Sequence, residues 1–407
     1  MKKSLTFLCI SCYFKGEAFL KSCKEQGNTV FLLTKQSLKD ADWPRESIDE
    51  MFFMEKEENT PENIANIIKG VAWLMKERKI DAVVALDDFD VEKAAAIREE
   101  FRIPGMGQTT ARYFRDKLAM RLRALDAGIS VPAFSPLFNN DEINHFADTV
   151  PAPWVVKPRS EASAMGIKKV FGKEQLWDVI NGLGDDRHGF LVEQFKPGDV
   201  FHVDSVTFDG KVEFTQVSKY LTTPFEVAHG AGIFRSVTCE YGSDDVKQLE
   251  KENKAVMKAF GMRQSASHSE FIKCHEDGKF YFLETSSRVG GAHLAEMVET
   301  ASGINLWWEW AKIEDAAARK ESYKAPKPEK NNAGIMISLA RYEYPDQSVF
   351  NAPEVVWKIN KKHHVGVIVT TPDRDRLFHL LDEYAQIVYR DFHASAPMPD
   401  KPDGNIG

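Results

Sequence analysis

The first hundred residues alternate between strand-like and helix-like segments. Strand-like runs occupy residues 4–12, 28–34 and 81–87, and helical patterns occupy residues 17–26, 62–78 and 91–101. Strands separated by helices of this length form a parallel sheet with crossover connections. The first turn, SCYFKGEAF, lacks the G-x-G-x-x-G sequence of dinucleotide-binding proteins. The sequence therefore predicts an N-terminal Rossmann-like domain, residues 1–108, without a dinucleotide site.

Two aspartates, Asp87 and Asp88, end the third of these strands. The carboxyl ends of parallel strands are where α/β folds place ligands. An aspartate before a helix is equally typical of an N-cap. Both interpretations stay open from the sequence.

Composition and charge exclude several classes of protein. The 407 residues include 43% hydrophobic and 28% charged residues, as in globular proteins, and the net charge of −8 argues against nucleic acid as a partner. The apolar run after Lys2 and Lys3 lacks a cleavage site and is interpreted as a buried strand. No run approaches about 18 apolar residues, so no membrane span is expected. Five scattered cysteines fit reduced thiols and a cytoplasmic location.

The rest of the chain is predicted to form two further units. Residues 109–325 form a larger domain that opens with a helix at Thr109–Ala127 and contains a mobile lobe at about residues 150–215. Residues 326–407 form a small C-terminal α+β unit. Its expected elements are the strands GIMISLA, HVGVIVT and QIVYRDF, a helix over Arg374–Tyr384, and a disordered tail, residues 393–407.

The segments HSEFIKC, residues 268–274, and KFYFLET, residues 279–285, form a predicted hairpin. A three-residue loop over 276–278 makes His275 face Lys279 and places Glu270 opposite Glu284. Alternation then puts Ile272, Phe280 and Phe282 on the same face as both glutamates.

Two facing carboxylates on an apolar face repel each other and are costly to desolvate. A divalent cation removes both problems, and Mg²⁺ suits carboxylates together with phosphate oxygens. The hairpin therefore predicts a metal–phosphate site at Glu270 and Glu284, with Arg288 facing the phosphate. The alternative is an exposed pair of glutamates with Arg288 as their salt-bridge partner.

Two neighbouring stretches fit a phosphate site. Between strand-like arms, residues 154–170 contain Lys157 and a loop with Ser160, Ser163 and Gly166, whose small residues allow backbone N–H groups to surround an anion. An ordinary hairpin is equally compatible with this stretch. In residues 191–212, a backbone edge beside Glu193 could contact a purine.

Five segments, in this order, resemble the ATP-grasp superfamily, particularly its carboxylate–amine ligases and biotin-carboxylase-like members. They are DKLAMRLRALDAGISVP, VVKPRSEASAMGI, LVEQFKPGDVFHVDS, HSEFI and FLETSSRVGGA. The resemblance covers about residues 1–390. It implies a two-lobed ATP-grasp domain for residues 109–325, between the Rossmann-like domain and the C-terminal unit.

The resemblance also implies roles for residues that match the superfamily's motifs. Lys117 and Lys157 match two lysines that contact nucleotide phosphates, and Ser160–Gly166 matches the loop that closes over them. The other implied nucleotide contacts are the hinge residues Glu193, Gln194, Phe195 and Lys196, followed by His202 and Asp204.

The implied metal ligands are Glu270 and Glu284, and Arg288 matches the arginine that stabilises the reacting phosphate. Ser286 stands where the superfamily usually has a metal-binding Asn, which puts the geometry of a second metal in doubt. The implied cofactors are ATP and Mg²⁺, with Mn²⁺ as a second option. No biotin-carrying A-M-K-M segment is present.

The stretch of residues 217–236 resembles the acceptor side of such a site. Lys219 and Arg235 could bind a substrate carboxylate, although a solvated hairpin with incidental charges explains them about as well. Candidates for a base or an orienting group are His229, His268 and Asp204.

Three functions follow from the resemblance. The favoured one is an ATP-dependent ligase that activates a small carboxylate, an amino acid or a related acid, as an acyl phosphate, and joins it to an amine with release of ADP and phosphate. The alternatives are a bicarbonate-using carboxylase and a nucleotide-binding protein without catalysis. The expected partners are small molecules, and a homodimer is a candidate assembly.

Overall fold

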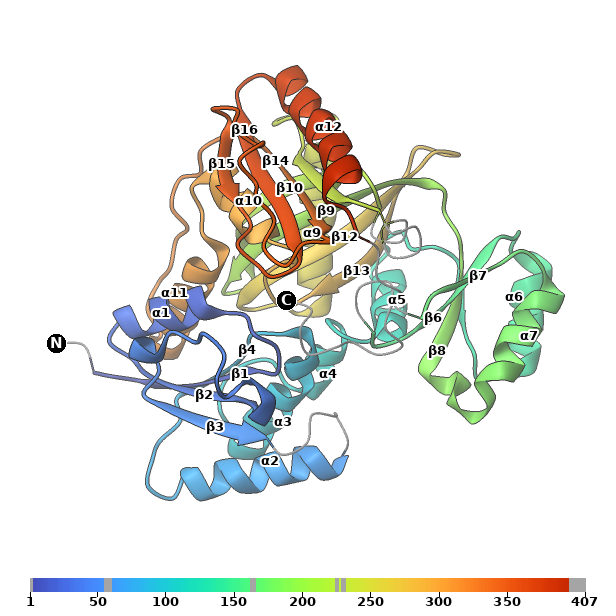
Figure 1. Cartoon of the computed structure of the whole chain (residues 1–407). Coiled ribbons are helices and arrows are strands. Elements are labelled where there is room, and N and C mark those ends of the chain that lie inside the picture. Colours follow the sequence, from blue (N-terminus) through green and yellow to red (C-terminus); the bar gives the residue numbers. More distant parts are fainter. Residues whose placement is uncertain (1–2, 55–60, 162–165, 224–226, 228–231, 395–407) are drawn as a thin grey trace.

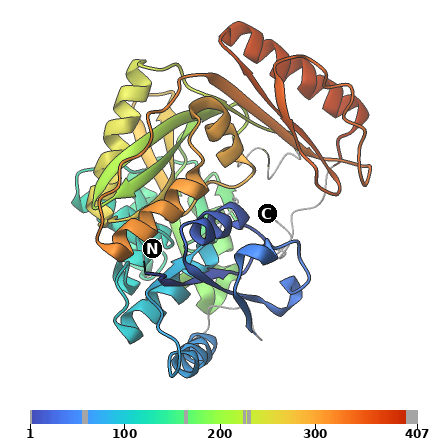
Figure 2. The same cartoon turned by 90° about the vertical axis from the view of Figure 1, so that its left-hand side faces the viewer.

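The computed structural model describes residues 3–54, 61–161, 166–223, 227 and 232–394. Two sheet-containing bodies lie against each other, and a smaller lobe stands to one side of them (Figure 1; a second view is Figure 2). The expected disordered tail lies outside the described residues from residue 395 onward.

The N-terminal sheet is parallel, as predicted. Its strand order is β3-β2-β1-β4, with bounds β1 Thr6–Ser11, β2 Thr29–Lys35, β3 Glu50–Met54 and β4 Ala82–Ala85. Its main helices are α1 Glu17–Glu25, α2 Pro61–Leu74 and α3 Val91–Phe101. The sequence did not predict β3, an edge strand in which most residues are only partly buried.

The single helix expected over Thr109–Ala127 is wrong. The chain forms α4 Gln108–Arg112 and α5 Lys117–Asp126 instead. The break occurs because the Asp116 carboxylate accepts the N–H groups of Leu118 and Ala119, which makes Asp116 the N-cap of a new helix.

The lobe contains a four-stranded sheet in the order β5-β8-β6-β7. The strands are β5 Phe134–Pro136, β6 Trp154–Pro158, β7 Lys168–Val170 and β8 Phe190–Gln194, and the helices are α6 Asn140–Thr149 and α7 Lys173–Leu183. This sheet begins and ends earlier than the expected lobe at residues 150–215. The strand that follows, β9, belongs to the larger sheet.

The larger sheet has eight strands in the order β13-β12-β9-β10-β11-β14-β16-β15. Their bounds are β9 Gly198–Phe208, β10 Lys211–Tyr220, β11 Phe234–Thr238, β12 Ser265–Cys274, β13 Phe280–Ser286, β14 Asn332–Leu339, β15 Val355–Lys358 and β16 His364–Thr371. The helices in this part of the chain are α9 Asp244–Phe260, α10 Leu294–Ser302, α11 Leu306–Arg319 and α12 Arg374–Asp391.

The C-terminal segment extends this sheet, because β14 pairs with β11. The expected strand QIVYRDF is wrong. Residues 386–391 continue α12, in which Leu377, Leu381 and Val388 recur on one buried face.

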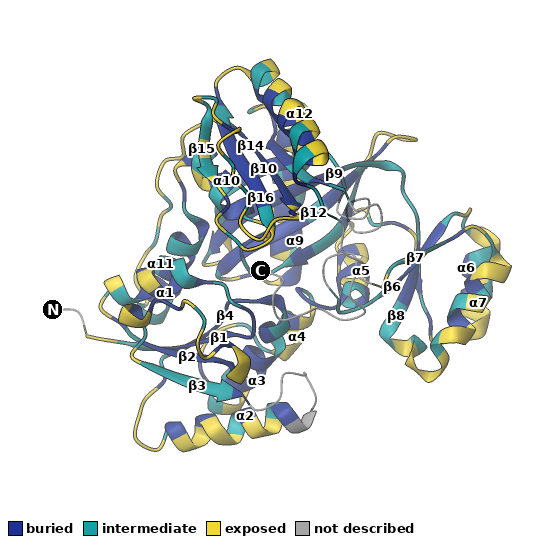
Figure 3. Ribbon diagram, in the orientation of Figure 1, coloured by how far each residue is buried: buried dark blue, intermediate teal, exposed yellow. Residues whose placement is uncertain are grey.

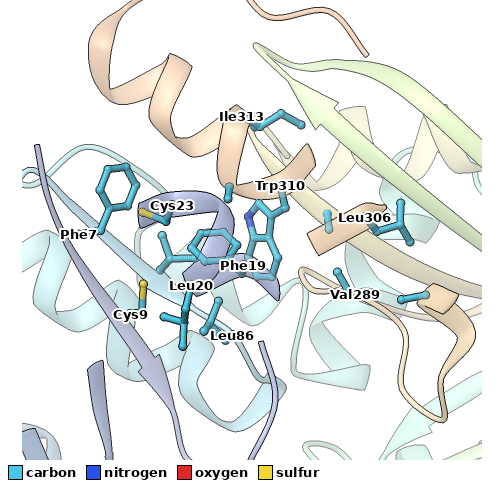
Figure 4. Close-up of a cluster of buried hydrophobic side chains, with 14 of the residues drawn as sticks. Phe7, Cys9, Phe19, Leu20, Cys23, Leu86, Val289, Leu306, Trp310 and Ile313 are labelled. Atoms are coloured by element: carbon cyan, nitrogen blue, oxygen red, sulfur yellow. The ribbon is translucent and has the colours of Figure 1, made fainter. Parts of the chain in front are cut away.

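One core joins the N-terminal sheet to the rest of the molecule. Phe19 of α1 meets Trp310 of α11 with ring centroids 5.1 Å apart, and Leu86 and Val289 belong to the same cluster (Figure 4). Figure 3 shows that the strands at the centre of the large sheet are also buried. The strand tips of both sheets are therefore held in fixed positions relative to each other.

Candidate active site

The β12–β13 hairpin pairs Glu270 with Glu284, as the sequence predicted. The loop length and the strand register that produce this pairing differ from the prediction. Cys274 donates its N–H to the Lys279 carbonyl, so the loop has four residues, His275–Gly278, and His275 does not face Lys279. A β-bulge then shifts the register by one residue just before Glu284. The bulge offsets the longer loop, which is why the predicted pairing is correct.

The bulge also decides which way Glu284 points. Phe280 and Phe282, expected on the face of the glutamates, instead pack in the core beneath α9, so that prediction is wrong. Ile272 belongs to the core of the opposite face, which by alternation it shares with Glu270. Because residues paired directly across two strands share a face, Glu284 lies on the Glu270 face.

Each carboxylate has one occupied oxygen. The Tyr220 hydroxyl donates to Oε1 of Glu270 at 2.8 Å, and the Lys117 ammonium lies 2.8 Å from Oε2 of Glu284. Within the described residues, Oε2 of Glu270 and Oε1 of Glu284 have no hydrogen-bond or ion-pair partner. Burial opposes the charge of Glu284, but Lys117 holds its pKa below the usual value. Ser286, two residues further along β13, lies on the same face.

The outer edge of β13 is closed by the segment before the lobe. The Phe282 N–H donates to the Ser130 carbonyl at 2.8 Å, and Nη1 of Arg121 donates to the Leu283 carbonyl at 2.5 Å. The carboxylate-bearing strand is therefore held on both sides.

Two buried cations hold Glu193. Nε of Arg121 donates to its Oε2 at 3.0 Å, and the Lys157 ammonium contacts its Oε1. Burial lowers the pKa of Lys157 to about 8, despite the opposing effect of Glu193. The sequence prediction missed Arg121, although its position four residues after Lys117 in α5 places both on one helix face. The Glu193 carboxylate is therefore occupied, and the adenine contact expected at this residue stays a prediction.

The expected phosphate loop is described only at its ends. Ser160 precedes it and Gly166 follows it, and Ser163 lies outside the described residues. Gly166 has φ +68°, and a Cβ there would lie 2.9 Å from the Pro158 ring, so the position favours glycine. Lys117 Nζ donates to the Glu161 carbonyl at 2.6 Å, which joins α5 to the start of the loop.

The expected hinge connects the two sheets. Gln194 ends β8, and Phe195 and Lys196 lead to β9. Nζ of Lys196 lies 4.7 Å from the centroid of the Tyr281 ring, and Nζ of Lys169 lies 3.4 Å from that of Phe195. The side chains of Phe195 and Lys196 are thus engaged within the protein, and the base contact expected of this segment stays a prediction.

A buried hydrogen-bond network lies next to Glu270. The Asp204 carboxylate accepts from Nδ1 of His202 at 2.7 Å and from Nδ1 of His268 at 2.8 Å. Burial favours a neutral His268 ring, but Asp204 raises its pKa to about 9. A Cβ at Gly290 would lie 2.9 Å from Nδ1 of His268, so glycine allows the strand tip to pass this close. The sequence did not predict Tyr220, which links the network to Glu270.

The nucleotide contacts expected from His202 and Asp204 stay predictions, because both side chains are fully buried. Their ligand atoms and those of His268 lie within 4.8 Å of one another, a spacing that could hold a metal ion. The hydrogen bonds among these side chains already compensate the charge of Asp204, so the cluster does not require an ion.

Lys219 and Arg235 lie on the opposite face of the sheet from Glu270. Lys219 pairs with Asp199 at 2.9 Å, and its neighbour Tyr220 points to Glu270. Arg235 pairs at 2.6 Å with Asp382, a residue of α12. The structure therefore does not bring these two expected acceptor residues together with the strand-tip carboxylates. The candidate base His229 lies outside the described residues.

Arg288 reaches across to the N-terminal domain. Its Nε donates to Oδ2 of Asp88 at 2.8 Å. Burial would raise the pKa of Asp88, but Arg288 and other nearby cations lower it to about 2. Asp87 accepts the Phe89 N–H at 3.0 Å and so caps the short helix that follows β4. The cap interpretation is thus confirmed for Asp87. Asp88 pairs with Arg288, and the ligand interpretation stays a prediction for it.

This arrangement has the chemistry of a metal–phosphate site. Glu270 and Glu284 offer oxygens to a hard cation, and Ser286 offers a hydroxyl on the same face. Lys117 and Lys157 come from different elements, and both lower the pKa of Glu284. Cations and carboxylates in one place can bind a polyphosphate together with its metal ion.

No family model matches the chain. In sequence it is similar to an L-arginine-specific L-amino acid ligase of Bacillus subtilis, with 26% identity over 240 residues. The match spans 58% of this chain and 57% of that relative. No helix in the described part of the chain has the length and apolar character needed to cross a bilayer.

Solved structures share the fold over nearly the whole chain. An L-amino acid ligase from Bacillus licheniformis superposes with a TM-score of 0.71 at 18% identity, covering 97% of this chain and 99% of that one. The biotin carboxylase domain of Hydrogenobacter thermophilus 2-oxoglutarate carboxylase, solved with MgADP, ADP and bicarbonate, gives 0.69 at 15% identity, covering 97% and 91%.

Proposed function

We propose that this chain, whose relatives and fold are those of the ATP-grasp carboxylate–amine ligases, is an ATP-dependent ligase that activates a small carboxylate as an acyl phosphate. An amine then displaces phosphate. The observation that carries this proposal is the strand tip, where Glu270 and Glu284 face each other and Arg288 follows on the same segment. The sequence relative named as an L-amino acid ligase supports an amino acid as one substrate.

In the first step, a carboxylate oxygen attacks the γ-phosphorus of ATP, and ADP leaves with the electrons of the broken P–O bond. In the second step, the amine nitrogen bonds to the acyl carbon as the C–O bond breaks. Phosphate leaves as HPO₄²⁻ with a proton from the nitrogen. Both steps move negative charge, and fixed cations around the phosphoryl group stabilise it.

Residues of this chain have separate roles in the proposed reaction. Glu270 and Glu284, with Ser286 beside them, would hold Mg²⁺ or Mn²⁺, which neutralises phosphate charge when bound. Lys117 and Lys157 bind phosphate oxygens. The nucleotide lies between the lobe, whose strand β6 carries Lys157, and the large sheet, whose strands β12 and β13 carry the two glutamates.

Arg288 has a planar guanidinium that can bond to two oxygens at once, and Asp88 fixes its orientation. This suits a group that holds the acyl phosphate. The expected products are ADP and phosphate, and AMP with pyrophosphate would contradict the role of Arg288. The cytoplasmic location and the homodimer expected from the sequence stay predictions.

The test is a screen of amino-acid pairs for ATP-dependent phosphate release, with mass spectrometry of the products. Glu284→Gln should abolish turnover while leaving the melting temperature close to that of the parent. Turnover at the parent rate would contradict the metal assignment. Turnover that depends on bicarbonate would favour a carboxylase, and ATP binding without turnover for any acceptor would favour a non-catalytic protein.

A further inference from the structure

Arg115 is a buried arginine without a polar partner for its side chain. Its exposed fraction is 7%, and within the described residues its guanidinium takes part in no hydrogen bond or ion pair. The Nε atom is fully buried. An unpaired buried charge is costly, so its retention calls for a specific explanation, such as a ligand of opposite charge that binds there.

The surroundings of Arg115 hold the guanidinium in place without neutralising it. The guanidinium carbon lies 4.4 Å from the centroid of the Phe89 ring. Arg115 lies in the turn after α4, where its N–H donates to the Arg112 carbonyl, and the next residue, Asp116, caps α5. Arg115 thus lies just before the helix that carries Lys117. It forms no ion pair with Glu284 or Glu193, which pair with other cations.

Asp88 presents the complementary feature. Its Oδ2 bonds to Arg288, whereas its Oδ1 is buried and has no hydrogen-bond partner among the described residues. Arg115 is close enough to lower the pKa of Asp88, but no ion pair joins the two side chains. A buried acceptor and a buried donor therefore lie near each other, and each lacks a partner.

We propose that the acceptor substrate is a free α-amino acid, bound with its carboxylate on the Arg115 guanidinium and its amino group against Oδ1 of Asp88. This inference rests on the proposed ligase function and names its amine substrate. The two ends of an amino acid carry a negative and a positive charge, which is the pair of charges that these side chains lack.

The position of Asp88 connects this subsite to the chemistry. One oxygen holds Arg288, the group that binds the acyl phosphate, and the other receives the amine, so a single carboxylate places the nucleophile beside the acyl carbon. With a pKa of about 2, Asp88 stays ionised and orients the ammonium group. The ammonium releases one proton to water before its neutral nitrogen attacks, and the second proton leaves with phosphate. Asp88 also follows β4, at the edge of a parallel sheet where ligands bind.

A contact between Arg115 and the substrate carboxylate predicts that the protein prefers acceptor molecules with a free carboxylate. An acceptor amino acid and its carboxamide have nearly the same shape, and only the first can form charge-assisted bonds to Arg115. The parent protein should therefore prefer the acid. In Arg115→Gln, the KM for the acid should rise roughly ten- to a hundredfold, while the KM for the carboxamide and for ATP stays near the parent value.

The experiment uses the full chain with MgATP, the best acceptor from the twenty standard L-amino acids, and the carboxamide of that acceptor. Arg112→Gln is the matched control, because Arg112 is an exposed arginine three positions earlier. Arg115→Lys keeps the charge and should recover part of the selectivity. Equal KM increases for acid and carboxamide would mean a structural defect and would overturn the subsite.

A separate measurement distinguishes failure of the subsite from failure of the ligase function. Melting temperatures are recorded without ATP, with each of the same amino acids. An amino acid that raises the Tm of the parent and of Arg112→Gln, but not that of Arg115→Gln or Asp88→Asn, supports the subsite even if no ligation occurs. Ligation whose acceptor KM is the same in the parent and in Arg115→Gln would overturn the subsite and leave the ligase function standing.

Discussion

At the scale of single residues, Tyr220 is expected to position a metal ligand. Its hydroxyl donates to Glu270, and Tyr220→Phe removes that bond while keeping the ring. Because bonds to charged groups contribute about 1.5–3 kcal/mol, the Mn²⁺ affinity should fall roughly tenfold or more. Electron paramagnetic resonance of bound Mn²⁺, measured with ADP, would show this directly.

Tyr281→Phe is the control for Tyr220→Phe. The Tyr281 hydroxyl donates to Asp277 in the exposed hairpin loop, so its loss should leave Mn²⁺ affinity unchanged. Equal Mn²⁺ affinities in Tyr220→Phe and the parent would contradict the positioning role of Tyr220.

Nucleotide affinity is expected to depend on pH through the charge of the Lys157 side chain. Its folded pKa of about 8 lies below the usual lysine value of about 10.4, so the folded protein loses this charge first as pH rises. The affinity for MgADP should be constant below about pH 8 and fall above it, by at most about tenfold per pH unit. Titration calorimetry between about pH 7 and 9.5 tests this. Lys157→Arg keeps its charge, so an equal fall in that variant would exclude Lys157 as the cause.

At the scale of elements, the N-cap of α5 is expected to fix Lys117. Asp116→Ala removes the acceptor for two backbone N–H groups and the ion-pair partner of Arg159, and it should lower the free energy of unfolding by about 1 kcal/mol or more. It should also raise the KM for ATP. Asn139→Ala removes the cap of α6, which is in the lobe, and should cost similar stability without changing that KM. A similar KM increase in both variants would show that stability alone is responsible.

Elements were predictable where local signals were strong. The helices near residues 17–26 and 91–101 and the strands β14 and β16 occur where their periodicity predicted them. The break at Asp116 was missed because apolar residues continue on both sides of it, and only the capping bonds reveal the new helix. QIVYRDF was interpreted as a strand because its β-branched and aromatic residues suit strands, whereas packing of α12 on β14 and β16 decides the outcome.

At the scale of the whole molecule, the shared core predicts that the N-terminal domain and the large sheet unfold together. Trp310→Ala should lower the free energy of unfolding by about 3–5 kcal/mol and shift a single calorimetric transition. Trp73→Ala is the control, because Trp73 is 70% exposed, and it should change stability little. Two transitions, of which only one moves with Trp310→Ala, would contradict a common core.

The sequence predicted site contacts between residues that are close along the chain, but not contacts between residues that are far apart along it. Glu270 and Glu284 are close in sequence, so a hairpin argument could pair them, and the resemblance supplied the lysines. Asp88 and Arg288 are 200 residues apart, and only the docking of two domains brings them together. The face of the sheet that Lys219 and Arg235 occupy depends on the pairing register of β10 and β11. No local sequence pattern determines that register.

The closed edge of β13 has a consequence for solubility. A terminal strand with unpaired N–H and C=O groups is a template for pairing with another chain. Here the Ser130 carbonyl and the Arg121 guanidinium occupy those groups at Phe282 and Leu283. Displacement of the segment around Ser130 would uncover this edge, and we expect a molecule in that state to associate with another copy through β13.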